Sequence, residues 1–307
     1  MYKVFIDGRE GTTGLRIAER LAQRKDIELL SIKEELRKDV QERLKLINAS
    51  DVTFLCLPDD ASKEIVAAAK DSTSKIIDAS TAFRCDDSWA YGFPELSAAY
   101  LKRIQTYNRI ANPGCHASGS IAVIAPLVAN DIVGNDYPFT ITSLTGYSGG
   151  GKKMIAEYEN PHDKEVDAPR LYALGQTHKH LPEIKKHCRL KINPIFLPIV
   201  APYYAGMLVT VGIENKSGKT LQEIHALFEG YYGAQEMVKV APLAETPKML
   251  GSNTLADKDY MKIFVCGNDE RITVSSQFDN LGKGASGAAI QCMNIALGLD
   301  PKEGLDL

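Results

Sequence analysis

The sequence lacks the features that mark a membrane, exported or nucleic-acid-binding protein. None of its apolar runs approaches the roughly 18 residues of a membrane-spanning helix. Met1–Ile6 leads straight into a predicted strand and does not have the layout of a signal peptide. The 36 basic residues do not outnumber the 39 acidic ones, which removes the electrostatic case for a nucleic-acid binder. We therefore expect a cytoplasmic protein with neither a membrane nor a nucleic-acid partner.

The sequence also lacks any CxxC pair. Its six cysteines are scattered, which excludes the usual zinc spacings and, without an export signal, predicts reduced thiols. We expect no metal site. Cys115 has a setting of its own, described below. The other five are expected to be small buried hydrophobic residues, namely Cys56, Cys85, Cys188, Cys266 and Cys292.

The first 80 residues alternate between predicted strands and helices. Short apolar strands are expected at Val4–Ile6, Ile27–Leu30, Val52–Leu57 and Lys75–Asp78. The nearly continuous apolar run of the third strand is typical of a strand covered on both faces. This alternation predicts an α/β fold with a Rossmann-type, doubly wound parallel sheet.

The later chain has longer, more alternating strand patterns, rich in Thr and Tyr. They predict a second α+β domain with a largely antiparallel sheet. The strands are expected at Phe139–Leu144, Lys191–Leu197, Leu208–Ile213 and Arg271–Gln277.

A length of 307 residues fits two domains. We predict a dinucleotide-binding domain over residues 1–114, completed by the C-terminal helical segment 285–307. Residues 115–284 are predicted to form the catalytic, substrate-binding and oligomerisation domain. We assign the C-terminal segment to the first domain because its last helix is apolar around much of its circumference.

A glycine-rich turn follows the first strand and opens a helix. Glycine at Gly8, Gly11 and Gly14 lets the backbone approach a pyrophosphate, and the helix N-terminus offers free N–H groups. Arg9, Thr12 and Thr13 share this turn and are candidate cofactor contacts. Because any strand-to-helix turn favours glycine, a plain turn is the alternative.

The end of the second strand favours NADP over NAD. NAD-binding proteins usually place an acid there to hold the ribose 2′-hydroxyl. Here Ser31 and Lys33 offer a hydroxyl and a cation, which suit a 2′-phosphate, and Arg9 can add a second cation. The alternative is that Lys33 is an ordinary solvated charge.

Cys115 follows a Pro-Gly turn and precedes an apolar helical run. It is therefore predicted at a helix N-terminus, where the helix dipole stabilises a thiolate. A nucleophilic thiol in a nicotinamide-binding protein suggests attack on an activated acyl carbon, followed by hydride exchange with a thioester or thiohemiacetal. A buried cysteine before a helix is the alternative.

Two histidines and a carboxylate lie within one short segment. His178 or His180 can act as the acid/base, while Glu183 can orient an imidazole or bind a substrate amide. On an extended strand the two histidines would point the same way, which also suits a metal. The lack of a third close ligand makes metal binding, like a solvated loop, the weaker interpretation.

Two further segments are candidate anion sites. Arg84 follows the fourth predicted strand, where an arginine can grip a carboxylate or phosphate. Ser148 and Gly149 begin a glycine-rich basic turn that can hold substrate. A surface arginine and a flexible hairpin are the respective alternatives.

Taken together, these segments resemble the N-acetyl-gamma-glutamyl-phosphate reductase family, especially its shorter class, within the semialdehyde dehydrogenase superfamily. They occur in family order along nearly the whole chain, and the sixth and seventh are the most specific. The matching segments are Gly8–Gly14, Asp78–Arg84, Tyr91–Leu96, Asn112–Cys115, Thr145–Gly151, His178–Glu183 and Asp279–Gly287.

The resemblance implies NADPH-dependent reductive dephosphorylation of N-acetyl-L-glutamyl 5-phosphate to the 5-semialdehyde in arginine biosynthesis, by a homodimer or homotetramer. It implies Cys115 as the nucleophile, with Arg84 and Glu183 holding the acyl phosphate substrate. It also implies cofactor contacts at Leu57, Pro58, Ser80, Asn280, Lys283 and Gly284.

The chain departs from the larger class of the family. Where that class commonly has an aromatic residue and a Thr after the cysteine, this chain has His116 and Ser118. An aspartate-semialdehyde dehydrogenase, a non-catalytic NADP-binding regulator and a cysteine hydrolase are the competing hypotheses. Aspartate-semialdehyde dehydrogenases lack the His178–Glu183 motif. A non-catalytic regulator would have no use for Cys115, and a cysteine hydrolase would have no use for Gly8–Gly14.

Overall fold

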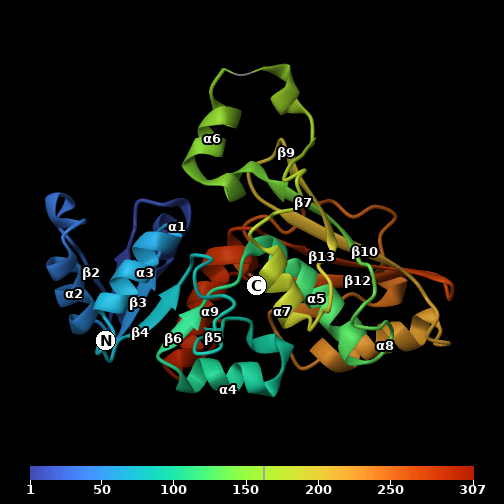
Figure 1. Cartoon of the computed structure of the whole chain (residues 1–307), viewed down its shortest axis with the longest axis horizontal. Coiled ribbons are helices and arrows are strands. Elements are labelled where there is room, and N and C mark those ends of the chain that lie inside the picture. Colours follow the sequence, from blue (N-terminus) through green and yellow to red (C-terminus); the bar gives the residue numbers. More distant parts are fainter. Residues whose placement is uncertain (162) are drawn as a thin grey trace. The chain divides into compact units, whose positions relative to one another are not determined.

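The computed structural model describes residues 1–161 and 163–307, which separate into two compact units (Figure 1). The first contains Met1–Pro113 and Ala285–Asp306. The second contains Gly114–Gly284 and the terminal Leu307. In the part of the chain described, no helix is both long and apolar enough to cross a membrane.

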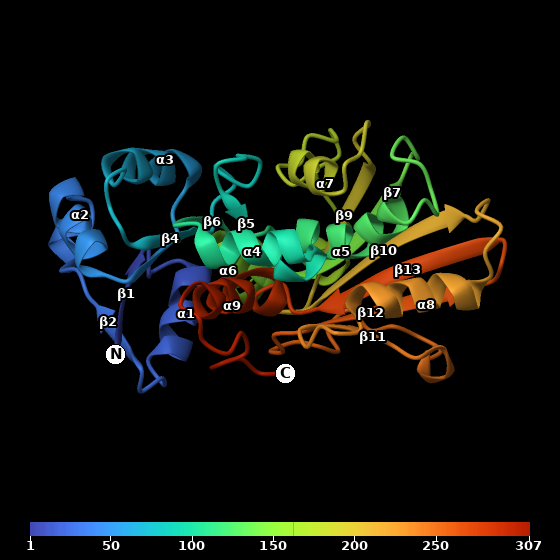
Figure 2. The same ribbon diagram turned by 90° about the horizontal axis from the view of Figure 1, so that it is seen from below.

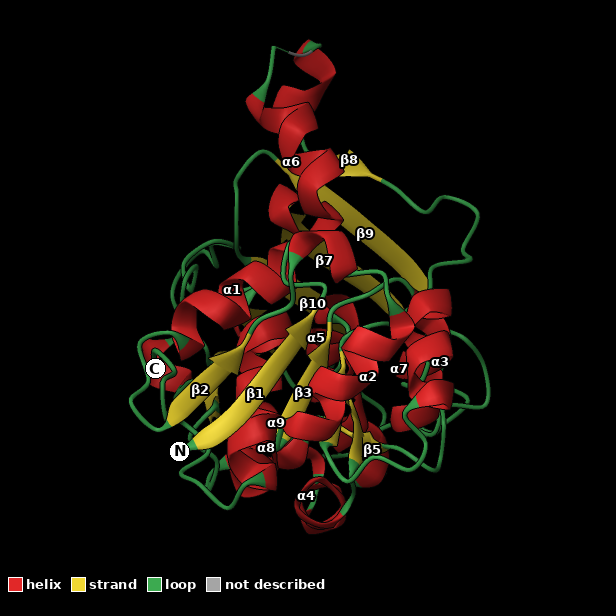
Figure 3. Cartoon of the chain, turned by 90° about the vertical axis from the view of Figure 1, so that its left-hand side faces the viewer, coloured by secondary structure: helices red, strands yellow, loops and turns green. Residues whose placement is uncertain are grey.

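The first unit is built on a six-stranded, wholly parallel sheet, which confirms the predicted Rossmann-type architecture. The strand order is β2-β1-β3-β4-β6-β5, and Figure 3 shows β2, β1 and β3 side by side. The strands are β1 (Tyr2–Asp7), β2 (Ile27–Leu30), β3 (Val52–Leu55), β4 (Lys75–Asp78), β5 (Ala90–Tyr91) and β6 (Arg109–Ala111).

Helices cover both faces of this sheet because successive strand residues point to opposite sides. Val4 packs in a cluster with α1 and α9, whereas its neighbour Phe5 packs in a separate cluster with α2 and α3. The helices of this unit are α1 (Thr12–Leu21), α2 (Val40–Ala49), α3 (Asp59–Ala68), α4 (Ala98–Thr106) and α9 (Gly287–Ala296).

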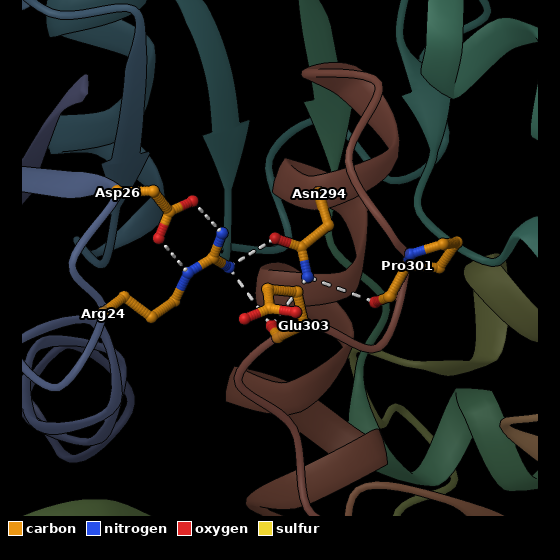
Figure 4. A network of polar contacts seen from close by, with 5 residues as sticks. All are labelled: Arg24, Asp26, Asn294, Pro301 and Glu303. Atoms are coloured by element: carbon orange, nitrogen blue, oxygen red, sulfur yellow. Dashed lines mark hydrogen bonds and ion pairs between the residues drawn. The ribbon is translucent and has the colours of Figure 1, made fainter.

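A buried arginine ties the C-terminal segment to the first turn of the chain after α1 (Figure 4). The Arg24 guanidinium pairs with the Asp26 carboxylate at 2.6 Å, and its Nη1 donates to Asn294 Oδ1 on α9 at 2.6 Å. The same Nη1 donates to the carbonyl of Glu303. These contacts, together with the apolar side of α9, explain why the C-terminus belongs to this unit.

The second unit contains a seven-stranded mixed sheet that is mostly antiparallel. Its order is β11-β12-β13-β10-β7-β9-β8, and only the β7–β9 and β11–β12 pairs are parallel. The strands are β7 (Thr140–Gly146), β8 (Arg170–Leu171), β9 (Ile195–Ala201), β10 (Met207–Glu214), β11 (Val238–Val240), β12 (Met261–Gly267) and β13 (Arg271–Phe278).

The predicted start of the strand expected at Lys191–Leu197 is wrong by four residues. Residues 191–194 form bends and irregular backbone, and β9 begins only at Ile195, after Pro194. Proline has no N–H for a strand ladder, so a strand starts more readily after it.

Helices lie on one side of the second sheet: α5 contacts β10 and β13, and α8 contacts β12 (Figure 2). The helix α6 lies near β9, since its Tyr158 packs with Val200 of that strand. The helices are α5 (Cys115–Ala129), α6 (Gly151–Glu159), α7 (Leu181–His187) and α8 (Leu221–Tyr232).

Candidate active site

The predicted nucleotide turn joins β1 to α1, and two of its glycines are required by the backbone. Gly8 has φ +83°, and a Cβ there would lie 2.4 Å from the carbonyl oxygen of Cys56. A Cβ on Gly14 would lie 2.6 Å from the carbonyl oxygen of Gly8. Gly8 therefore lets the turn pack against the residue after β3, and Gly14 lets α1 approach the turn itself.

Gly11 differs because none of the described residues crowds it. The nearest atom to a Cβ there is 3.5 Å away, and Gly11 is the N-cap of α1 with ordinary extended backbone. Among the described residues, the buried Thr12 Oγ1 beside it has no hydrogen-bond partner. A helix N-terminus with an open glycine and an unused hydroxyl fits the pyrophosphate of a dinucleotide.

The other candidate cofactor residues of this unit surround the ends of the strands. Ser31 and Lys33 are exposed just beyond β2, and Arg9 is exposed in the turn. Leu57 and Pro58 lie between β3 and α3, where Pro58 is the N-cap. The buried Ser80 donates its hydroxyl to Asp78 Oδ2 at 2.6 Å, which fixes the segment leading to Arg84.

Arg84 is anchored by the backbone of its own unit. Its Nε donates to the carbonyl of Asn112 and its Nη2 to the carbonyl of Ala79, both at 2.9 Å. Only 7% of the residue is exposed, so the alternative of a surface arginine is excluded. Its neighbour Cys85 is exposed, so the expectation of a buried thiol there is wrong: the residue lies in a surface turn after the anchored arginine. Cys56 and Cys266 are half-buried, so that of the five only Cys188 and Cys292 are buried as expected.

Cys115 is the first residue of α5, as predicted from the Pro-Gly turn. Gly114 is the N-cap, and the first turn holds no acidic residue to oppose a thiolate. Cys115 is half-buried, whereas the following residues of the helix are buried. By contrast, burial raises the pKa of the Cys56 thiol to about 12, which suits an inert structural cysteine.

Glu183 braces the residue before the thiol. Its Oε1 accepts a hydrogen bond of 2.8 Å from the N–H of Gly114, and the side chain is 1% exposed. The contact links α7 to the start of α5, although 69 residues separate the two positions. The carboxylate thus fixes the backbone from which the nucleophile projects.

His178 and His180 lie together, but not on an extended strand. They occupy a turn that enters α7, and the N–H of His180 is directed at His178 Nδ1 at 3.2 Å. Their ring centroids are 4.7 Å apart. His180 is buried, whereas His178 is partly exposed. Burial, with a smaller contribution from Lys179, lowers the pKa of His178 to about 4.

His116 completes this cluster and was missed as a functional residue by the sequence analysis. Its ring lies 5.5 Å from that of His178 and 5.7 Å from that of His180. Burial is the main cause that lowers its pKa to about 3, so the imidazole is neutral at physiological pH. A polar residue directly after the nucleophile, where the larger class has an aromatic one, was the available signal.

Ser148 of the predicted substrate turn forms a hydrogen bond with Asn280, a predicted cofactor contact. Asn280 Nδ2 donates to Ser148 Oγ at 2.9 Å, and both side chains are buried. Gly149 lies beside the same amide, because a Cβ on Gly149 would be 3.5 Å from Asn280 Nδ2. Gly284 faces the nucleophile, since its Cβ would lie 3.0 Å from the Cβ of Cys115. Lys283, one residue earlier, is almost fully buried.

Among the described residues, no group of three His, Cys, Asp or Glu side chains is placed to hold a metal ion.

Comparison with known families assigns both parts of the chain. Residues 3–104 match the NAD binding domain of semialdehyde dehydrogenases, and residues 115–280 match the dimerisation domain of the same family.

Named relatives are similar along nearly the full length. A protein of Rhizobium leguminosarum bv. trifolii named N-acetyl-gamma-glutamyl-phosphate reductase is 45% identical, over 96% of this chain and 98% of its own. A Nostoc sp. protein, N-acetyl-gamma-glutamyl-phosphate reductase 2, is 42% identical, with 99% of each chain covered. The resemblance inferred from the motifs is thereby confirmed.

Solved structures support the fold. Aspartate semialdehyde dehydrogenase II of Vibrio cholerae, complexed with ASA, gives a TM-score of 0.72 at 15% identity, over 97% of this chain and 98% of that one. The Candida albicans aspartate semialdehyde dehydrogenase with NADP gives a TM-score of 0.66 at 14% identity, over 96% and 98%.

Proposed function

Because the chain belongs to the N-acetyl-gamma-glutamyl-phosphate reductase family of semialdehyde dehydrogenases, we propose that it reduces N-acetyl-L-glutamyl 5-phosphate to N-acetyl-L-glutamate 5-semialdehyde. The products also include NADP⁺ and inorganic phosphate, and the reaction belongs to arginine biosynthesis. The observation that carries the proposal is the thiol of Cys115 at the start of α5, beside a cluster of imidazoles.

The first step forms a thioester. The Cys115 thiolate attacks the acyl carbon of the substrate, and the C–O bond to the phosphate breaks, so that phosphate leaves. The N-terminus of α5 stabilises the attacking thiolate and presents backbone N–H groups toward the developing oxyanion. The brace from Glu183 to the Gly114 N–H keeps this end of the helix in place.

The second step requires a group that first donates a proton and then accepts it again. NADPH, when bound, supplies the hydride that reduces the thioester carbon. An imidazole of the His178–His180 pair, which must take up a proton for this step, donates that proton to the substrate oxygen and takes it back as the C–S bond breaks and the aldehyde forms. We assign this role to His178, because it is partly exposed whereas His180 is buried at the entry to α7.

The remaining site residues are assigned to binding. Arg84 is held by two carbonyls and is suited to bind a carboxylate or phosphate of the substrate. Ser148, Gly149 and Glu183 are proposed to hold substrate, which remains a prediction.

The cofactor contacts are likewise proposed. NADPH would be held by the Gly8–Gly14 turn, with Ser31 and Lys33 at the 2′-phosphate. The remaining proposed contacts are Leu57, Pro58, Ser80, Asn280, Lys283 and Gly284.

The match to a dimerisation domain supports a homo-oligomer, and we propose a dimer or tetramer. We further propose that the enzyme works in the cytoplasm.

A spectrophotometric assay in the oxidative direction tests the proposed reaction. The enzyme, NADP⁺ and phosphate are mixed with N-acetylglutamate semialdehyde or with aspartate semialdehyde, and absorbance is followed at about 340 nm. We expect turnover with the N-acetylated substrate at least tenfold above that with the other. The reverse order would favour an aspartate-semialdehyde dehydrogenase, and no turnover with either would contradict the proposal.

A further inference from the structure

His116 lies at the centre of the ring cluster beside the nucleophile. Its ring contacts those of His178 and His180, with centroids 5.5 and 5.7 Å away. It also contacts Tyr172 at 6.1 Å and Phe196 at 5.3 Å. The residue that follows Cys115 in the helix therefore contacts both imidazoles assigned to the reaction.

Both nitrogens of His116 are engaged by hydroxyl groups. Nδ1 lies 2.6 Å from Ser143 Oγ on β7, and Nε2 lies 2.7 Å from the Tyr172 hydroxyl just after β8. A neutral imidazole has one donor and one acceptor nitrogen, so it can satisfy both hydroxyls at once. When Ser143 donates to Nδ1, Nε2–H donates to the Tyr172 oxygen and leaves the phenolic proton for another acceptor.

The Tyr172 phenol lies within reach of the charge of a Cys115 thiolate. Its pKa is raised chiefly by burial, and the Cys115 thiolate raises it further. The phenol therefore stays protonated and lies within electrostatic range of the thiolate. A neutral O–H donor so placed can stabilise a thiolate or the oxyanion that follows from it.

We infer that His116 is a positioning residue of the reaction site, which holds the Tyr172 phenol in one orientation toward Cys115. This assignment rests on the proposed function only for its kinetic effect, because the geometry concerns the free enzyme. A protonated side chain at position 116 would place a cation beside the imidazoles of His178 and His180. The neutral ring of His116 adds no such charge.

Three substitutions separate the two hydrogen bonds of His116. His116→Phe removes both while keeping a ring. His116→Gln carries its terminal amide near the position of Nε2 and can keep the Tyr172 contact. His116→Asn reaches only the position of Nδ1 and can keep the Ser143 contact.

The inference predicts unequal kinetics at comparable stability. His116→Phe and His116→Asn should lower kcat about tenfold with KM within about twofold, because a small misplacement of a reacting group is costly. His116→Gln should retain most of kcat. Equal kcat in the Gln and Asn variants, at similar Tm, would overturn the inference.

A matched control separates positioning from simple loss of stability. His225 is also buried on a helix of this unit, and its Nε2 lies 2.8 Å from the Ala241 carbonyl. His225→Phe should lower Tm while leaving kcat per folded enzyme unchanged. If His116→Phe behaves in the same way, its role is structural and the inference fails.

A double-mutant cycle tests whether His116 acts through Tyr172. If it does, His116→Phe should have almost no further effect on kcat in a Tyr172→Phe background. Independent, additive losses would overturn the proposed route.

Thiol alkylation gives a readout that needs neither substrate nor cofactor. The rate at which iodoacetamide modifies Cys115 at pH 7 is measured by mass spectrometry of its peptide. We expect His116→Phe and Tyr172→Phe to slow this rate by similar factors, and His225→Phe to leave it unchanged. An unchanged rate in the first two variants would refute the inference even if the proposed reaction is correct. Conversely, the expected rates would stand even if the wild type proved inactive on the N-acetylated semialdehyde.

Discussion

The two imidazoles at the entry to α7 differ in exposure, and we propose that this difference gives them different roles in the reaction. His178 is partly exposed, whereas His180 is 4% exposed and its backbone N–H is directed at His178 Nδ1. A group that exchanges protons with substrate must be able to reach it, so His178 is the better candidate for acid/base catalysis.

Asparagine substitutions test this division. His178→Asn should lower kcat by about 10²–10⁴-fold, the usual contribution of a general acid–base group. His180→Asn should mainly raise KM. Steady-state kinetics of the two variants measure both parameters, and near-normal rates in both would remove this segment from the mechanism.

The low pKa of His178 predicts the pH dependence in the oxidative direction. Because its pKa is lowered from 6.5 to about 4, the neutral, proton-accepting form persists as the pH falls through 6 and 5. The acidic limb of kcat/KM should therefore lie well below pH 6.5. A limb centred near 6.5 would show that another, unperturbed group accepts the proton.

At the scale of elements, the turn from β1 to α1 contains glycines of two kinds. Gly8 and Gly14 are required by the fold, because a Cβ at either position would overlap backbone atoms. Gly11 is open to its surroundings and caps α1, so its lack of a side chain serves whatever approaches the helix N-terminus.

Substitutions at these positions should separate folding from cofactor binding. Gly8→Ala should cost about 1–3 kcal/mol of stability, because alanine is strained at positive φ. Gly11→Asp and Gly11→Asn should fold normally, since both residues are good N-caps. The aspartate should weaken NADPH binding by tenfold or more relative to asparagine, through repulsion of the phosphates. Calorimetry and fluorescence titration measure the two effects, and equal NADPH affinity in the Asp and Asn variants would contradict this assignment of the site.

The sequence predicted the N-terminal strands well, but it missed the seven-residue strand β12 and the shortest elements. The four N-terminal strands were predicted because each is an apolar run that ends at a turn residue. The two-residue strands β5 and β8 could not be predicted, since only their neighbours define them. The start of β9 was misplaced because Lys191–Pro194 continues a plausible strand pattern that the proline interrupts.

The same limit applies to the site. Cys115 could be predicted because a local Pro-Gly turn and an apolar helix define its position. The function of His116 could not, because its partners Ser143 and Tyr172 lie 27 and 56 residues further along the chain. Likewise, nothing local indicates that Glu183 accepts a hydrogen bond from Gly114.

At the scale of the whole molecule, a buried neutral histidine links stability to pH. His116 has a pKa of about 3 when folded and an ordinary value of 6.5 when unfolded. Below pH 6.5 the unfolded chain binds a proton that the folded protein does not. Stability is therefore fully present above pH 6.5 and is lost as the pH falls toward 3.

Denaturant unfolding at two pH values tests this linkage. At about 1.4 kcal/mol per pKa unit, His116 alone should reduce the free energy of unfolding by about 2 kcal/mol between pH 7 and pH 5. His116→Phe should show a loss smaller by that amount over the same interval. Parallel pH dependence in the variant and the wild type would mean that His116 is not neutral in the folded protein.

The central claim is that Cys115 carries the acyl group of the substrate, and trapping that group tests it most directly. The enzyme is mixed with N-acetyl-L-glutamyl 5-phosphate in the absence of NADPH, and both released phosphate and protein mass are measured. The account predicts about one phosphate released per active site and one N-acetylglutamyl group on the Cys115 peptide, both absent in Cys115→Ser. An acyl group on another residue, or turnover in Cys115→Ser comparable to that of the wild type, would contradict it.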